Sequence, residues 1–104
     1  MTSHAEQITT LIEDLRVDLR LDELNANVND DNRLTILLSR SMAYLDGQMG
    51  VVVDYVNDLV ARELLFNRVR YDYNSALEYW NDNFHGELLA LQLKYGVEDN
   101  ATTI

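Results

Sequence analysis

The chain has 104 residues, 47% of them hydrophobic, and 18 acidic against eight basic side chains give it a formal net charge of −10. This length predicts one domain with a modest core. The charge argues against binding to a phosphate backbone or an anionic membrane, because both need clustered Lys and Arg. Cysteine is absent from the sequence, which excludes disulfides and thiolate chemistry. Without a signal-peptide pattern or an apolar run of membrane-spanning length, we expect a soluble protein, cytoplasmic at synthesis.

The first expected element is an amphipathic helix over about residues 4–20. Ser3 and Glu6 have the spacing of a capping box, in which each side chain satisfies the other residue's free backbone donor. Apolar residues then recur at steps of three and four, as on one face of a helix. They are Ile8, Leu11, Ile12, Leu15 and Leu19.

A second helix is expected over about residues 31–46. The polar segment 22–32 precedes it, and Asp30 or Asp31 can cap its first turn. Its inward stripe is formed by Leu34, Leu37, Leu38, Ser41, Met42 and Leu45. A turn with two glycines follows, so the helix is predicted to end near Gly47.

The third element, predicted over about residues 51–69, opens with three consecutive valines. Such a β-branched run is also typical of a short strand. Apolar residues continue at helical spacing through Val56, Leu59, Val60 and Leu64, and this continuation favours a helix.

The fourth helix is expected over about residues 74–95, where Ser75 and Glu78 repeat the capping-box spacing. Its stripe contains Leu77, Trp80, Phe84, Leu88, Leu91 and Tyr95. A glycine inside a helix costs about 1 kcal/mol relative to alanine. Gly86 therefore makes residues 82–86 the weakest part, where a mild kink is possible.

Together these elements predict an all-α fold, a small bundle of about four helices in a single domain over residues 1–96. Gly96 is expected to cap the last helix, and residues 97–104 are expected to form a flexible polar tail. Eight apolar side chains of the stripes are predicted to lie in the core: Leu11, Leu15, Leu37, Val56, Leu77, Trp80, Phe84 and Leu88.

The sequence offers no pattern for a metal, a cofactor or a catalytic residue. Zinc needs about four nitrogen or sulfur ligands, or three and a water, whereas the two histidines, His4 and His85, lie far apart. We expect His4 to be solvated and His85 to lie at the surface or in an interface. The segment starting at Asp72 begins like a calcium loop but has Leu77 where the loop needs glycine. The acidic residues fall mostly on polar helix faces, which are solvated by default.

A candidate protein interface lies near the end of the third helix, because Tyr and Arg are the residues that most often anchor such interfaces. Its residues are Arg62, Arg68, Arg70, Tyr71 and Tyr73. The alternative is that the two tyrosines simply cover the end of that helix. Residues 1–31 carry eight acids against two arginines, so this acidic start and the arginine segment could pair between copies of the chain.

The order of these features resembles the small head–tail connector proteins, also called adaptors or head-completion proteins, of long-tailed bacteriophages. The resemblance covers most of the chain and rests on pattern and length, because the family has no invariant catalytic motif. The net charge of −10 is a mild departure from its typical members. The segments that carry the resemblance are LRLDE (Leu19–Glu23), the Asp30–Asp31 pair, LTILLSRSMAYLDG (Leu34–Gly47), RVRYDYNSALEYW (Arg68–Trp80) and NFHGELLALQLKYG (Asn83–Gly96).

The resemblance implies a four-helix fold and a homo-oligomeric ring, a dodecamer, in the assembled particle. Such a ring docks beneath the portal protein, completes the DNA-filled head and offers the docking site for a stopper or tail-completion protein. DNA passes through its channel without specific binding, and no reaction, cofactor or membrane is involved. The implied location is the head–tail interface of the virion, with assembly in the host cytoplasm.

An acidic DNA-mimic, or another inhibitor that binds a basic partner, is the alternative function. High negative charge on a small helical body favours it, whereas the seven arginines and the aromatic-rich last helix argue against it. A small enzyme is the third possibility, and the sequence shows no assembled site for one.

Overall fold

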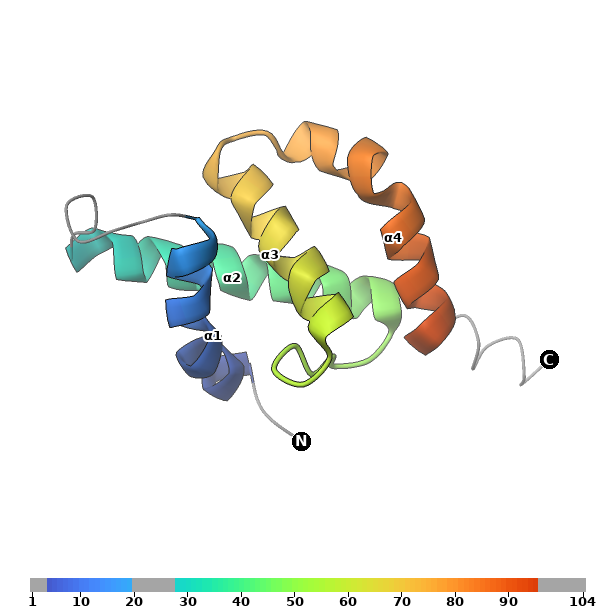
Figure 1. The fold of residues 1–104 in the computed structure, drawn as a ribbon, viewed down its shortest axis with the longest axis horizontal. Helices are drawn as coiled ribbons and strands as arrows, with labels where there is room; N and C mark the ends of the chain where they lie inside the picture. The colour runs from blue at the N-terminus through green and yellow to red at the C-terminus, as the bar shows by residue number, and fades with distance from the viewer. Residues whose placement is uncertain (1–3, 20–27, 96–104) are drawn as a thin grey trace.

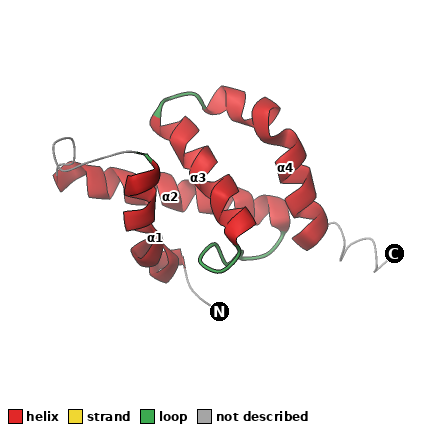
Figure 2. Ribbon diagram, in the orientation of Figure 1, coloured by secondary structure: helices red, strands yellow, loops and turns green. Residues whose placement is uncertain are grey.

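The computed structural model describes residues 4–19 and 28–95, and these ranges contain four α-helices, one short 3-10 helix and no strand. The elements are, in chain order, α1 (His4–Asp18), α2 (Val28–Met49), α3 (Leu59–Tyr73), η1 (Leu77–Tyr79) and α4 (Trp80–Tyr95). Figures 1 and 2 show α2, α3 and α4 connected by loops. The predicted all-α class with about four helices is therefore confirmed.

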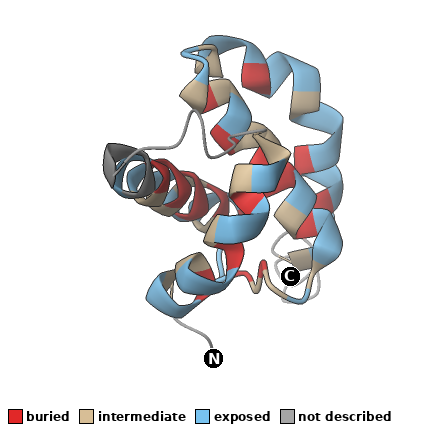
Figure 3. Cartoon of the chain, turned by 60° about the vertical axis from the view of Figure 1, so that its left-hand side comes forward, coloured by how far each residue is buried: buried red, intermediate tan, exposed pale blue. Residues whose placement is uncertain are grey.

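The long helix α2 forms the base of the arrangement. α1 and α3 cross the same side of α2, and α4 lies on the far side of α3 from α1 (Figure 1). Each helix turns apolar residues inward, so the described helices share one core. Figure 3 shows this as buried residues on the inward faces, while the outward face of α4 is exposed.

Five of the eight predicted core residues are buried, and three lie at the edge of the core. The buried ones are Leu11, Leu15, Leu37, Trp80 and Leu88. Val56, Leu77 and Phe84 are partly buried and pack against the core. Tyr55, which the helical stripes do not include, is among the largest fully buried side chains.

Helix α2 extends beyond both of its predicted ends. It starts at Val28, so Asp30 and Asp31 lie in its first turn instead of preceding it. At the other end it continues through Gly47. Gly50 then ends it with φ +76°, a conformation that glycine adopts without steric cost. The prediction that this helix stops near Gly47 is wrong because the second glycine, not the first, takes the left-handed conformation.

The largest departure from the sequence prediction is the segment 50–58, which is mostly a loop, so that α3 begins at Leu59. The side-chain amide of Gln7, on α1, both donates to and accepts from the backbone of this loop, as the backbone of a neighbouring strand does in a sheet. Its Nε2 donates to the Val53 carbonyl at 3.0 Å, and its Oε1 accepts the Tyr55 N–H at 2.8 Å. These bonds satisfy buried backbone groups that a helix would otherwise satisfy internally.

Two aspartates complete the loop and start α3. Asp54 accepts the backbone N–H groups of the next turn at 3.1 and 3.2 Å, which is typical turn chemistry for Asp. Asp58 is the N-cap of α3, and its carboxylate accepts the Ala61 N–H at 3.1 Å. The helix then runs to Tyr73, past its predicted end.

The start of α4 differs from the prediction, whereas its weak point lies where it was expected. Ser75 has φ +57°, and Ala76 is the N-cap of η1 without a side-chain hydrogen bond. The predicted capping box at Ser75 and Glu78 is therefore wrong. Phe84 has the non-helical torsions φ −121° and ψ 17° inside α4, which confirms a kink within residues 82–86.

Some predictions fall on residues outside the described ranges. They are the capping residue Ser3, the predicted end of the first helix at residue 20, the first part of the polar connection, the cap Gly96 and the tail 97–104.

Candidate protein-binding groove

Two of the predicted interface arginines contact α1 or the loop before α3: Arg62 contacts both, and Arg70 contacts α1. Arg62 donates to two loop carbonyls at 3.1 and 2.7 Å and reaches Asp14 at 3.4 Å. Arg70 pairs with Asp18 at 2.7 Å. Two acids of the acidic start, Asp14 and Asp18, thus pair with the arginine segment within one chain.

Arg68 lies in an aromatic cluster at the junction of α2, α3 and α4. Its guanidinium stands 3.7 Å from the ring centre of Tyr44 and 4.8 Å from that of Trp80. The nearby Asp72 carboxylate favours the charged form of Arg68. Asp72 itself accepts two hydrogen bonds from Arg40, at 2.7 and 2.6 Å. Burial lowers the pKa of Arg68. Cation–π contacts of this kind contribute about 0.5–2 kcal/mol, so Arg68 braces the interior.

The two predicted interface tyrosines, Tyr71 and Tyr73, are partly buried against the core. Tyr71 packs edge-on against Phe84 with ring centres 5.5 Å apart, and its hydroxyl accepts a bond from Asn83. Tyr73 lies under the guanidinium of Arg33 at 4.9 Å. The five predicted interface residues therefore contact different neighbours within the chain, on α1, α2 and α4, and do not form one patch.

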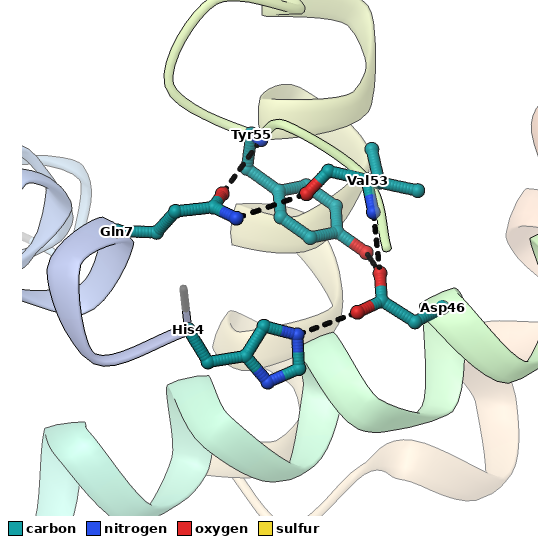
Figure 4. A network of polar contacts seen from close by, with 5 residues as sticks. All are labelled: His4, Gln7, Asp46, Val53 and Tyr55. Atoms are coloured by element: carbon teal, nitrogen blue, oxygen red, sulfur yellow. Dashed lines mark hydrogen bonds and ion pairs between the residues drawn. The ribbon is translucent and has the colours of Figure 1, made fainter. Parts of the chain in front are cut away.

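A polar network joins α1, α2 and the loop before α3 (Figure 4). Asp46 accepts the Val53 N–H at 3.1 Å and the Tyr55 hydroxyl at 2.8 Å through Oδ1, and its Oδ2 lies 2.5 Å from His4 Nε2. The expectation that His4 is solvated is wrong, because α1 crosses α2 next to Asp46. Gln7 extends the network from α1.

The chemistry of this network is structural. Tyr55 is fully buried, and burial raises its pKa, with the hydrogen bond to Asp46 acting in the same direction. The carboxylate of Asp46 is occupied by three partners. A histidine, a carboxylate and a tyrosine thus lie close together: His4 and the Tyr55 hydroxyl both bond to Asp46, which also accepts the Val53 N–H of the loop.

One open site in the described part of the chain lies between α3 and α4, which touch at both ends. At one end, Asp58 accepts bonds from the Lys94 ammonium at 2.8 Å and from the Tyr95 hydroxyl. At the other end, Tyr71 packs against Phe84. The kink at Phe84 interrupts α4 at this second contact, so the two helices touch at their ends and leave a groove between them.

This space is a groove with a cavity of about 250 Å³. Apolar side chains from both helices form most of its lining: Val60 and Leu64 from α3, and Phe84 and Leu91 from α4. The cavity is smaller than the roughly 300–1,000 Å³ of a typical small-molecule site. Its size therefore suits a few inserted side chains better than a metabolite.

Acidic side chains stand at the edge of the groove. Glu63 on α3 and Glu87 on α4 line it and are exposed, and neither forms an ion pair with any described residue. Most carboxylates elsewhere in the described chain have basic or backbone partners. The groove thus combines an apolar floor with two unpaired negative charges.

Sequence reasoning missed this groove, although two signals bear on it. Helical spacing places Val60 on the inward stripe, but it lines the groove and is 68% exposed. The sequence also predicts the weak point of the last helix, but its effect on the spacing of two helices depends on tertiary contacts. Periodicity finds the apolar face of a helix and does not say whether a neighbour covers all of it.

Within residues 4–19 and 28–95, no three side chains of the metal-binding types gather to hold an ion. In the same ranges, no helix has the length and apolar character needed to cross a lipid bilayer. Comparison with family models, curated proteins and solved structures gives no match for this chain.

Proposed function

We propose that this chain is a structural, non-catalytic head–tail connector of tailed-phage particles. In this proposal it forms a ring of identical subunits, a dodecamer, beneath the portal protein and provides the docking site for a stopper or tail-completion protein. DNA passes through the ring without specific binding. The protein acts at the head–tail interface of the virion after assembly in the host cytoplasm.

One observation carries the proposal: the groove between α3 and α4 leaves apolar side chains open to solvent beside exposed acidic residues. Val60, on the α3 wall of the groove, is 68% exposed. Exposed apolar surface rimmed by polar residues is typical of a protein-interaction site. The all-α bundle is also the fold that the resemblance implies.

The acidic-mimic alternative receives less support from the same contacts. A mimic of a phosphate backbone needs an array of free carboxylates. Asp14, Asp18, Asp58 and Asp72 instead pair with basic side chains of the same chain. Among the described residues, this internal pairing uses several of the acids that an imitation of a regular row of phosphates would need.

Electron microscopy of the purified chain mixed with DNA-filled, portal-bearing capsids that lack their connector tests the proposal. We expect a ring of added density beneath the portal and no such ring on capsids without a portal. No ring on portal-bearing capsids, together with salt-sensitive competition between the chain and DNA for a basic enzyme, would support the mimic instead.

A further inference from the structure

We propose that the α3–α4 groove binds an amphipathic helix of the partner protein, one that places apolar side chains in the groove and Lys or Arg beside them. This inference rests on the proposed function in one respect: it takes the partner to be a protein of the head–tail junction. The chemistry by which the groove would recognise a helix follows from the groove residues alone.

The shape of the groove matches one face of a helix. Its α3 wall runs from Val60 to Asn67, about two helical turns or roughly 10 Å. Helices that bind in grooves use anchors at positions i, i+3 or i+4, and i+7, which cover this length. A second hollow beside Ala90 and Lys94 shares Val60, Glu87 and Leu91 with the first. The groove therefore continues toward the end of α4.

The charges around the groove select a basic partner. Glu63 and Glu87 line the groove from opposite helices, and neither is paired with a described residue. The cation at the far end, Lys94, is neutralised by Asp58. Complementary charge steers association and fixes register. Lys or Arg beside the anchors would meet carboxylates from both walls.

The groove is already formed in the free chain, which lowers the cost of binding. Asp58 with Tyr95 closes one end, and Tyr71 with Phe84 closes the other. The helices do not have to separate to admit side chains. Binding to a preorganised site avoids part of the ordering entropy that a flexible site loses.

Two model peptides and three variants of the full chain test the inference. The basic peptide is helix-forming, of about 15 residues, with Leu at i, i+3 and i+7 and Lys beside them, and the matched peptide has Glu in place of Lys. The variant Val60→Asp places a charge in the groove. Leu59→Asp is its control, because Leu59 is 65% exposed, close to the 68% of Val60, and does not line the groove. The double variant Glu63→Lys/Glu87→Lys reverses the charge at the edge of the groove.

We expect fluorescence anisotropy to show binding of the basic peptide to the unmodified chain and to Leu59→Asp within about twofold. Binding to Val60→Asp should be at least about tenfold weaker, a loss of 1.4 kcal/mol. The double variant should reverse the preference to the acidic peptide. All four substituted positions are exposed, so circular dichroism should show all variants folded.

The inference is overturned if the basic peptide does not bind, if the acidic peptide binds as tightly, or if Val60→Asp and Leu59→Asp behave alike. Capsid binding separates this from the proposed function. If Val60→Asp joins portal-bearing capsids as well as the unmodified chain does, the groove is not the docking site and the connector function stands. If the unmodified chain does not join capsids but binds the basic peptide selectively, the connector function fails and the groove stands.

Discussion

The two halves of the molecule use their polar side chains differently. Around α1, α2 and the loop before α3, the polar groups of His4, Gln7, Asp46 and Tyr55 bond to one another or to the loop backbone. Between α3 and α4, polar contacts lie at the two ends, at Asp58 and between Asn83 and Tyr71. The middle is an apolar groove with unpaired acids at its edge. The first half is thus held by bonds to buried backbone groups, whereas α3 and α4 are held together mainly at their ends.

Under the proposed function, this contrast lets a small chain combine a defined fold with a surface for a partner. Hydrogen bonds to buried backbone groups fix the geometry of one half. The other half leaves the apolar surface of the groove, which the proposal assigns to the partner. Substitutions in each half should therefore have different consequences.

The largest effect is expected for Trp80→Ala at the closed end of the α3–α4 pair. Trp80 is fully buried, stacked against Phe84 and edge-on to Tyr44. Its loss should lower the free energy of unfolding by about 3–5 kcal/mol, measured by urea denaturation. Tyr79→Ala, next to it but exposed, should stay within about 0.5 kcal/mol of the unmodified chain. Similar losses for the two variants would mean that the aromatic cluster does not hold this end together.

A smaller loss in the free energy of unfolding is expected for Gln7→Ala, in the half that contains α1, α2 and the loop before α3. The substitution leaves the Val53 carbonyl and the Tyr55 N–H buried without their partner, at about 1–3 kcal/mol for each group. With two groups affected, we expect a total loss at the lower end of the summed range, about 2–4 kcal/mol, in the same denaturation experiment. Thr9→Ala, exposed on the same helix, is the control. A near-neutral Gln7→Ala would show that other contacts position the loop.

The smallest effect, and the one that reports on pH, is expected for Asp58→Asn at the far end of the groove. Burial acts to raise the pKa of Asp58, but bonds from Lys94, Tyr95 and the Ala61 N–H outweigh it and lower the pKa below its ordinary 3.8. A carboxylate whose pKa is lower in the folded state stabilises the fold above that ordinary value, and this stabilisation is lost as the pH falls through the folded value.

Asparagine caps a helix as well as aspartate does, so Asp58→Asn removes mainly the charge. The difference in melting temperature between the unmodified chain and Asp58→Asn should be largest near neutral pH and should shrink below about pH 3.8. A difference that is constant with pH would show that the Lys94 and Tyr95 contacts do not depend on the Asp58 charge. The opposite shift at Tyr95, whose pKa burial and Asp58 raise to about 12, places its own titration above the ordinary value of 10.0.

The sequence was sufficient for the elements and for much of the core, because apolar spacing reports directly on the inward face of a helix. It placed Leu11, Leu15 and Trp80 correctly. It failed at residues 50–58, since the side chain that holds this loop, Gln7, is 46 residues away from its partner Val53. Its polar character gave no sign that it would be buried.

The candidate site shows the same limit. Arg62 and Arg70 have the composition of an interface, but their partners Asp14 and Asp18 lie 48 and 52 residues away in the chain. An ion pair at that separation depends on how helices cross, which periodicity does not encode. The groove likewise depends on where α3 and α4 touch, and only the three-dimensional arrangement reveals it.

Hydrogen–deuterium exchange of the full chain, free and bound to portal-bearing capsids, tests the central contrast most directly. We predict that binding slows exchange in residues 59–67 and 84–94, which form the groove, and leaves residues 4–18 nearly unchanged. Slower exchange confined to residues 4–18, with the groove segments unaffected, would contradict the central contrast, in which the polar network around α1 stabilises the fold and the α3–α4 groove binds the partner.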